Sequence, residues 1–182
     1  MLKPSENPPV LSPQAQTVTD LSGRWWVAHT RARSEKALAW DLFRRGIGYF
    51  LPLVERVTVS GGKKRRVQMP LFPSYVFFCG TDTDRYSAMT TNHVCQTLDV
   101  FNQEGLVMEL SAISKALAGK AELDLYPFAV AGQRCRITAG PFEGIQGVVV
   151  RRKETARLVL EIGILGQGAS LEIDADLLQP IA

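Results

Sequence analysis

Apolar residues along the first two thirds of the chain follow two kinds of spacing. Alternating apolar residues predict strands at residues 24–30, 49–60 and 74–79. Between the first two strands, apolar residues recur three and four positions apart, as at Leu38 and Leu42, which predicts a helix with one buried side. This part of the chain therefore combines strands and helices.

Helical spacing disappears after Phe128. Short extended runs follow, with Gly140-Pro141 and Gly166-Gln167-Gly168 among the turns between them. Several short strands at even spacing within about 50 residues are typical of a small barrel. The chain is therefore expected to be α+β, with a disordered tail at 1–21, a mixed domain at 22–118, a linker at 119–127 and a β module at 128–182.

The strand at 74–79 follows a stiff connector that contains two prolines. Alternation places Tyr75 and Phe77 on one face and apolar residues on the other, so both faces need cover. The pattern leaves two interpretations open. The segment is either a buried central strand or, together with Phe72, an apolar pocket for a partner.

A row of cations lies on the polar side of the predicted helix. Arg33, Lys36, Trp40 and Arg44 are spaced three, four and four residues apart. Cations neutralise phosphates and an indole stacks on bases, so the row fits a nucleic-acid contact. A solvated basic face, with Trp40 covered by the alkyl stems of its neighbours, explains the same pattern.

Gly61-Gly62 predicts a hairpin turn, and four cations follow it at residues 63–66. Four successive cations repel one another unless they are solvated or bound to an anion. The same tip therefore fits an exposed, soluble loop or a DNA contact.

Composition limits the remaining functions. The net charge is only +3, so the placement of charge matters more than its sum. The chain has only two histidines, His29 and His93, and three cysteines without metal-ligand spacing, which argues against an enzyme, a metal site or a cofactor. No apolar run reaches the roughly 20 residues of a membrane span, so a cytoplasmic protein is expected.

Both halves of the chain, in order, resemble the NusG family of transcription elongation factors. In the first half the matching segments are Arg24-Trp25-Trp26-Val27 and Pro70-Leu71-Phe72-Pro73-Ser74-Tyr75-Val76-Phe77. The segment at 70–77 matches the family's Phe-Pro-Gly/Asn-Tyr-Val/Leu core, with Ser74 in place of glycine or asparagine. In the second half, residues 132–137 and 140–149 resemble the KOW module, with Gly147 at the family's fixed glycine.

The resemblance implies a fold. The first domain would be a ferredoxin-like NGN domain, with an antiparallel sheet flanked by helices, and the second a five-stranded SH3-like barrel behind a flexible linker. In one specialised branch of the family the barrel refolds into a helical hairpin. Here Val148-Val149-Val150 favours strands, so a barrel is expected.

The resemblance also implies a function without bond chemistry. Such factors bind the clamp helices of the RNA polymerase largest subunit and bridge the DNA channel, which modulates pausing and termination. The residues that match the clamp-helix pocket are His29, Phe72, Tyr75 and Phe77. The basic first helix would lie near upstream DNA and the non-template strand, through Arg31, Arg33, Lys36, Trp40, Arg44 and Arg45.

The branch of the family stays open. The long polar tail and the residues of motifs such as Pro70-Leu71-Phe72-Pro73 resemble those of specialised paralogues that antiterminate long operons, often for polysaccharide synthesis. A housekeeping factor is the first alternative, and a ribosome- or RNA-binding KOW protein the second. In the family the barrel contacts the termination factor Rho or a small-subunit ribosomal protein, and a monomer is expected.

Overall fold

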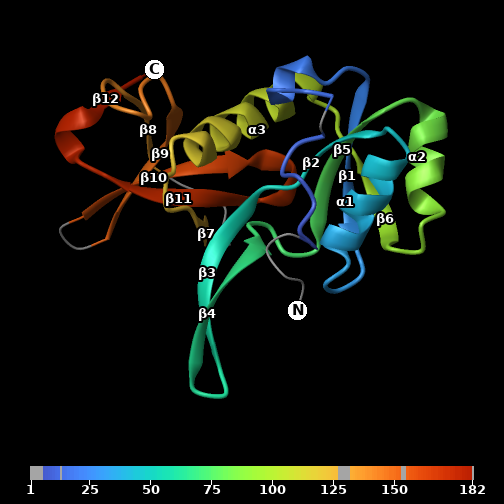
Figure 1. The fold of residues 1–182 in the computed structure, drawn as a ribbon. Coiled ribbons are helices and arrows are strands. Elements are labelled where there is room, and N and C mark those ends of the chain that lie inside the picture. Colours follow the sequence, from blue (N-terminus) through green and yellow to red (C-terminus); the bar gives the residue numbers. More distant parts are fainter. Residues whose placement is uncertain (1–5, 13, 127–131, 153–154, 182) are drawn as a thin grey trace. The chain divides into compact units, whose positions relative to one another are not determined.

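The computed structural model describes residues 6–12, 14–126, 132–152 and 155–181. The chain divides into two compact units, Met1–Gln103 and Glu104–Ala182, which are described separately below (Figure 1).

The first unit is built on a four-stranded antiparallel sheet with strand order β2-β5-β1-β6. Its strands are β1 (Arg24–Thr30), β2 (Gly48–Phe50), β5 (Tyr75–Gly80) and β6 (Val94–Asp99), and its α-helices are α1 (Glu35–Arg44) and α2 (Asp82–Met89). A 3-10 turn, η2 (Val18–Asp20), precedes the sheet. Strand β5 lies inside the sheet, as its apolar residues on both faces predicted.

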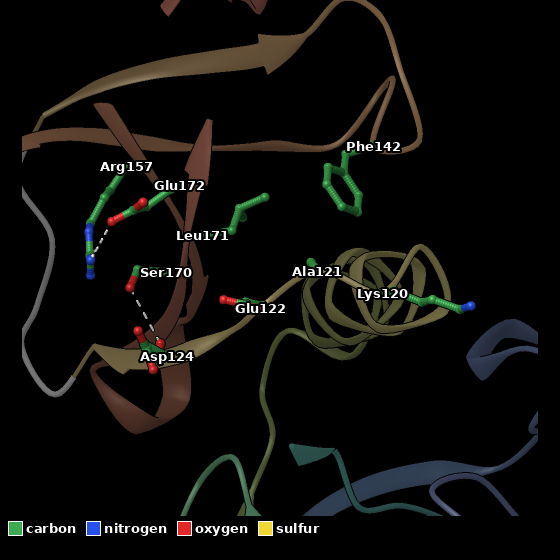
Figure 2. Close-up of a pocket in the computed structure, with 9 residues that line it drawn as sticks. All are labelled: Lys120, Ala121, Glu122, Asp124, Phe142, Arg157, Ser170, Leu171 and Glu172. Atoms are coloured by element: carbon green, nitrogen blue, oxygen red, sulfur yellow. Dashed lines mark hydrogen bonds and ion pairs between the residues drawn. The ribbon is translucent and has the colours of Figure 1, made fainter. Parts of the chain in front are cut away.

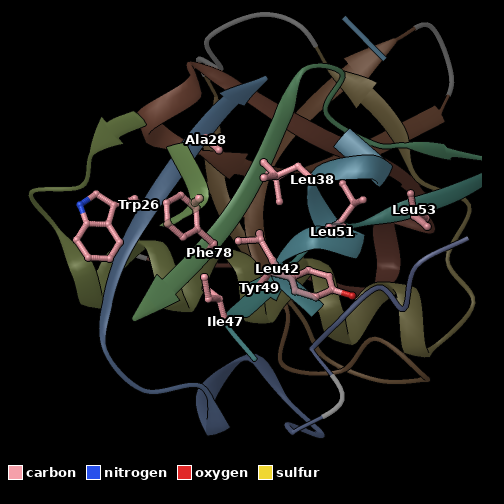
Figure 3. Packing of buried hydrophobic residues seen from close by; sticks show 12 residues of the cluster. Trp26, Ala28, Leu38, Leu42, Ile47, Tyr49, Leu51, Leu53 and Phe78 are labelled. Carbon is pink, nitrogen blue, oxygen red and sulfur yellow. The ribbon is translucent and has the colours of Figure 1, made fainter. Parts of the chain in front are cut away.

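The core of this unit lies between the sheet and α1 (Figure 3). Trp26 of β1 stacks on Phe78 of β5 with ring centroids 5.6 Å apart. Leu38 and Leu42 of α1 are fully buried in the same cluster, which confirms the helical stripe read from the sequence. Val76 and Phe78 belong to this cluster, so Tyr75 and Phe77 face the other side of the sheet.

Of the expected disordered tail at 1–21, residues 1–5 and 13 lie outside the described residues, whereas residues 6–12 contact the rest of the first unit. Leu11 forms a bridge with Phe50, and the Leu51 N–H donates to the Val10 carbonyl at 2.7 Å. Tyr49 donates its hydroxyl to the Pro9 carbonyl at 3.0 Å. The segment thus follows the outer edge of β2, which would otherwise present unpaired backbone groups.

A long hairpin of β3 (Leu53–Ser60) and β4 (Lys63–Pro70) extends away from the four-stranded sheet (Figure 1). Gly61 and Gly62 have φ angles of 58° and 74°, which is the conformation of a type I′ turn and explains why two glycines stand there. Among the described residues the two strands pair with each other and with no third strand.

The second unit contains α3 (Gln103–Ala118, from Glu104 onward) and a six-stranded antiparallel sheet with strand order β12-β8-β9-β10-β11-β7. The strands are β7 (Asp124–Tyr126), β8 (Gln133–Ile137), β9 (Gln146–Arg152), β10 (Thr155–Ile162), β11 (Gln167–Ile173) and β12 (Leu178–Pro180), with 3-10 turns η3 (Gly163–Leu165) and η4 (Ala175–Leu177). The α+β class, with an antiparallel sheet flanked by helices and a β module after it, is confirmed.

One detail of the second unit departs from the sequence predictions. The segment 119–127, expected to be a linker, contains β7, which pairs with β11 and adds a sixth strand to the expected five. Residue 127 of the expected linker and residues 128–131 of the expected β module lie outside the described residues.

Helix α3 packs on the sheet of its own unit. The Gly163 N–H donates to both carboxylate oxygens of Glu109 at 3.2 Å, and Lys115 donates to the Glu143 carbonyl. A side chain at Gly119 would overlap the Phe142 ring, whose Cε1 lies 2.7 Å from the ideal Cβ position. The sequence boundary after residue 118 and the structural boundary after Gln103 therefore do not coincide.

Candidate functional site

A tight turn at Phe72-Pro73-Ser74-Tyr75 leads into β5. The Tyr75 N–H donates to the Phe72 carbonyl at 3.2 Å, Pro73 occupies the second position, and Ser74 has a φ of 68°. These features match a type II turn, which requires a positive φ at its third residue. The geometry explains why the family pattern has glycine or asparagine there.

Ser74 is held in this conformation by two neighbours. Its N–H donates to Glu35 Oε1 at 2.6 Å, and its carbonyl accepts from the Thr30 N–H at 2.8 Å. Glu35 is the first residue of α1 and is only 6% exposed, so this buried carboxylate ties the helix to the turn. Sequence patterns did not identify Glu35, because no local pattern links residues so far apart in the chain.

The turn delivers Tyr75 to a position opposite His29. The two residues are register partners on β5 and β1, and their ring centroids lie 5.3 Å apart with planes tilted by 31°. Both side chains are half-buried, so each keeps an accessible edge. This pair, here called the His29–Tyr75 surface, is the accessible part of the expected aromatic pocket.

The other two expected pocket residues, Phe72 and Phe77, lie in the interior. They are 1% and 0% exposed and pack edge to face, with centroids 6.0 Å apart. Phe77 also approaches Phe50 of β2 at 6.5 Å. The sequence analysis expected both residues to contact a partner. In the structure they are buried and pack beneath the turn and against the sheet, so this expectation is corrected.

Two members of the predicted nucleic-acid row are engaged inside the protein. Lys36 donates to Asn7 Oδ1 at 2.6 Å and to the Gln68 carbonyl at 2.5 Å, and burial lowers the pKa of its ammonium group, against a smaller raising effect of Glu35. Trp40 donates its Nε1–H to the Glu6 carbonyl at 2.9 Å. Both side chains thus hold the N-terminal segment, which the helical spacing of the row could not reveal.

The other four predicted DNA contacts differ in their hydrogen bonds and ion pairs. Arg44 forms an ion pair with Asp41 at 2.8 Å, and Arg45 donates to the Ser87 carbonyl and hydroxyl at 2.7 Å. Arg31 and Arg33 are exposed, and their side chains form no hydrogen bond or ion pair with the described part of the chain. Of the six predicted DNA contacts, these two are exposed and have no such contact within the described residues.

The second unit has a hollow of about 350 Å³ between the end of α3 and the sheet (Figure 2). Arg157 and Glu172 form an ion pair across its lining at 2.7 Å, and the Ser170 hydroxyl donates to the Asp124 carbonyl at 3.5 Å. These groups satisfy one another, so the hollow is a packing feature of β7, β10 and β11 rather than a set of groups arranged for chemistry.

The described residues also bear on metal binding and membrane insertion. Within the described ranges, no group of three or more His, Cys, Asp or Glu side chains is placed to hold a metal ion. No helix in the described part of the chain is long and apolar enough to cross a membrane.

Comparison with known proteins identifies the family. The family model described as "Transcription termination factor nusG" matches residues 23–116, more than half of the chain. A solved structure entitled "Domain interaction in Thermotoga maritima NusG" is 18% identical, with a TM-score of 0.44, over 87% of this chain and 97% of that chain. A search of curated protein sequences gave no significant match.

The fold defines the class first, as a mixed α/β domain followed by a β module, the architecture of NGN–KOW proteins. Within that class, the match over residues 23–116 shows that the chain belongs to the NusG family of transcription factors.

Proposed function

We propose that this protein is a transcription elongation factor that binds the RNA polymerase clamp through the His29–Tyr75 surface and acts as an antiterminator of particular operons. The observation that carries the proposal is the aromatic pair itself, half-exposed and fixed by the rigid turn at residues 72–75. Rigid aromatic side chains lose little conformational entropy on binding and are common anchors of interfaces.

The proposed action needs no bond to be made or broken. A factor that bridges the channel binds the closed, elongating polymerase better than the paused one. Its differential affinity then shifts the population toward elongation. Exposed Arg31 and Arg33 supply contacts to single-stranded DNA, whose contribution falls with salt by a slope of about −0.7 for each phosphate met.

Polymerase binding by single-site variants tests the proposal. Tyr75→Ala and His29→Ala are each expected to weaken binding to purified polymerase by tenfold or more, about 1.4 kcal/mol, with the far-UV spectrum unchanged. Tyr86→Ala is the matched control, since Tyr86 is a tyrosine 71% exposed on α2, outside the proposed surface. Binding is measured by surface plasmon resonance or native gel shift.

Two results would contradict the proposal. If Tyr75→Ala bound polymerase with the affinity of the wild type, the His29–Tyr75 surface would not be part of the interface. Equal losses in Tyr75→Ala and Tyr86→Ala would show that the effect is not specific. Phe72→Leu is expected to lower stability rather than change binding selectively, because Phe72 is buried.

In vitro elongation separates the branches of the family. On a template with a pause and a terminator, an operon-specific antiterminator is expected to act only with its own recruiting sequence, whereas a housekeeping factor acts on any template. Pull-down with Rho, ribosomes and polymerase identifies the partner of the second unit and tests the ribosome-binding alternative.

A further inference from the structure

The β3–β4 hairpin holds positive charge outside the His29–Tyr75 surface. Residues 53–70 contain five cations and one carboxylate, Glu55, which gives a net charge of +4. The whole chain has a net charge of +3, so the rest of the chain carries a slight excess of negative charge. The net positive charge of the protein thus resides in this hairpin.

Most of this charge is accessible. The side chains of Lys63, Lys64, Arg65 and Arg66 are exposed. Arg66 forms an ion pair with Glu55 at 3.4 Å, while the side chains of Lys63, Lys64 and Arg65 have no ion pair or hydrogen bond among the described residues. Neighbouring like charges without partners repel, so an anion bound at the tip would relieve that repulsion.

The strand register places cations on both faces of the hairpin. Arg66 lies opposite Val57 and Lys64 opposite Val59 on one face, whereas Arg65 lies opposite Thr58 on the other. An element that rests on a flat anionic surface needs cations on one face only. A ribbon in a groove turns one face to the base edges, and long Lys and Arg side chains from either face can extend past its edges to the phosphates that border the groove.

The face that carries Lys64 and Arg66 also carries two exposed valines. Val57 and Val59 are 61% and 68% exposed, and no described element covers them. The major groove of B-form DNA is about 12 Å wide, accepts a two-stranded β-ribbon and displays thymine methyl groups that such side chains can contact. A-form RNA has a deep and narrow major groove that excludes a ribbon.

We propose that the β3–β4 hairpin binds double-stranded DNA by entering its major groove. Lys63, Lys64 and Arg65 contact the phosphates, and Val57 and Val59 face the base edges. This binding goes beyond the proposed polymerase contact, involves different residues and needs no polymerase. A failure of the polymerase test therefore does not bear on it.

The test measures binding of the full chain to a short DNA duplex, to one of its single strands and to an RNA duplex of the same sequence, by fluorescence anisotropy. The DNA duplex is expected to bind most tightly. The triple variant Lys63→Gln/Lys64→Gln/Arg65→Gln is expected to bind the duplex at least about tenfold more weakly at ~0.1 M salt. The slope of log affinity against log salt is expected to shrink by about 2.7, or about 0.9 for each phosphate that is no longer neutralised.

Two further variants control for charge and fold. Lys63→Arg/Lys64→Arg keeps the charge and is expected to keep the affinity. The triple variant Lys120→Gln/Arg134→Gln/Arg136→Gln removes the same charge from exposed positions of the second unit and is expected to bind like wild type. Far-UV spectra and melting temperatures verify that all variants fold.

Several outcomes would overturn the proposal. An equal loss of DNA affinity in the two triple variants would show that the effect depends only on net charge. Tighter binding of the single strand or of the RNA duplex than of the DNA duplex would exclude insertion into the major groove. Cations on exposed strand edges also protect proteins from aggregation. A glutamine variant that aggregates while its soluble fraction keeps wild-type DNA affinity would assign the cations to that protective role alone.

Discussion

At the residue scale, Ser74 shows how a small departure from a family pattern takes on physical meaning. A non-glycine residue with a φ of 68° has its Cβ close to the backbone, at a cost of roughly 1–2 kcal/mol. Glu35 and Thr30 hold the residue there nonetheless. The surface that presents Tyr75 is therefore slightly strained.

Substitution of Ser74 tests this strain. Ser74→Gly is expected to stabilise the protein by about 0.5–1 kcal/mol, because relief of the strain exceeds the extra entropy of glycine in the unfolded chain. Ser74→Val is expected to destabilise the protein by ~1–3 kcal/mol, because a β-branched residue is strained at positive φ. Urea unfolding measures both, and a lower midpoint for Ser74→Gly would refute the strain.

Two buried groups predict how stability depends on alkaline pH. Burial, with a smaller effect of Asp84, raises the pKa of Cys79 from 9.0 to about 12, and burial raises the pKa of Tyr49 from 10.0 to about 12. Because the native state keeps these protons longer than the unfolded state, the stabilising contribution is complete below the unfolded pKa. It is lost as pH rises toward 12.

The free energy of unfolding, measured under reducing conditions, is therefore expected to fall above pH 9 by up to about 1.4 kcal/mol per pH unit for each group. In Cys79→Ala the decline is expected to begin about one pH unit higher, where Tyr49 takes over. Cys95→Ala, at an exposed cysteine, is the control. Identical pH profiles of wild type and Cys79→Ala would contradict the assignment.

At the element scale, sequence patterns predicted β5 and α1 but not the path of the N-terminal segment. Strand β5 and helix α1 were predictable, because the periodicity of their own residues decides which face is buried. The path of residues 6–12 depends on partners such as Lys36 and Tyr49, which lie far along the chain. A proline-rich composition alone suggested disorder.

Deletion of residues 2–12 tests the contribution of the N-terminal segment. Loss of its hydrogen bonds to Lys36, Trp40 and the β2 edge is expected to cost roughly 2–4 kcal/mol, at about 0.5–1.5 kcal/mol for each bond. Tryptophan emission is expected to shift to the red, because Trp40 loses its cover while Trp25 and Trp26 stay buried. A deletion of residues 2–5, which removes none of these contacts, is the control, and unchanged stability of the longer deletion would be the contrary result.

The candidate site was predictable in part for a related reason. A motif identifies which residues share a face, as for Tyr75 and Phe77, but alternation carries no information about depth. Phe77 lies inside the sheet while Tyr75, near its rim, keeps an accessible edge. Exposure depends on the whole arrangement of strands, which a single segment cannot encode.

At the scale of the whole molecule, the family match and the compact units cut the chain at different places. The match extends to residue 116, inside α3, yet α3 from Glu104 onward groups with the six-stranded sheet. The sequence predicted the change from helical to strand spacing correctly. It could not predict that the helix before this change contacts the sheet after it.

The position of α3 has a consequence for chimeric proteins. Experimenters who exchange C-terminal modules between paralogues choose the junction from sequence, which here would fall just after residue 118. A graft at that point would set a foreign module against a resident helix whose Glu109 and Lys115 are matched to the Gly163 amide and the Glu143 carbonyl. A junction near Gln103 transfers helix and sheet together, and so keeps donor and acceptor from the same parent.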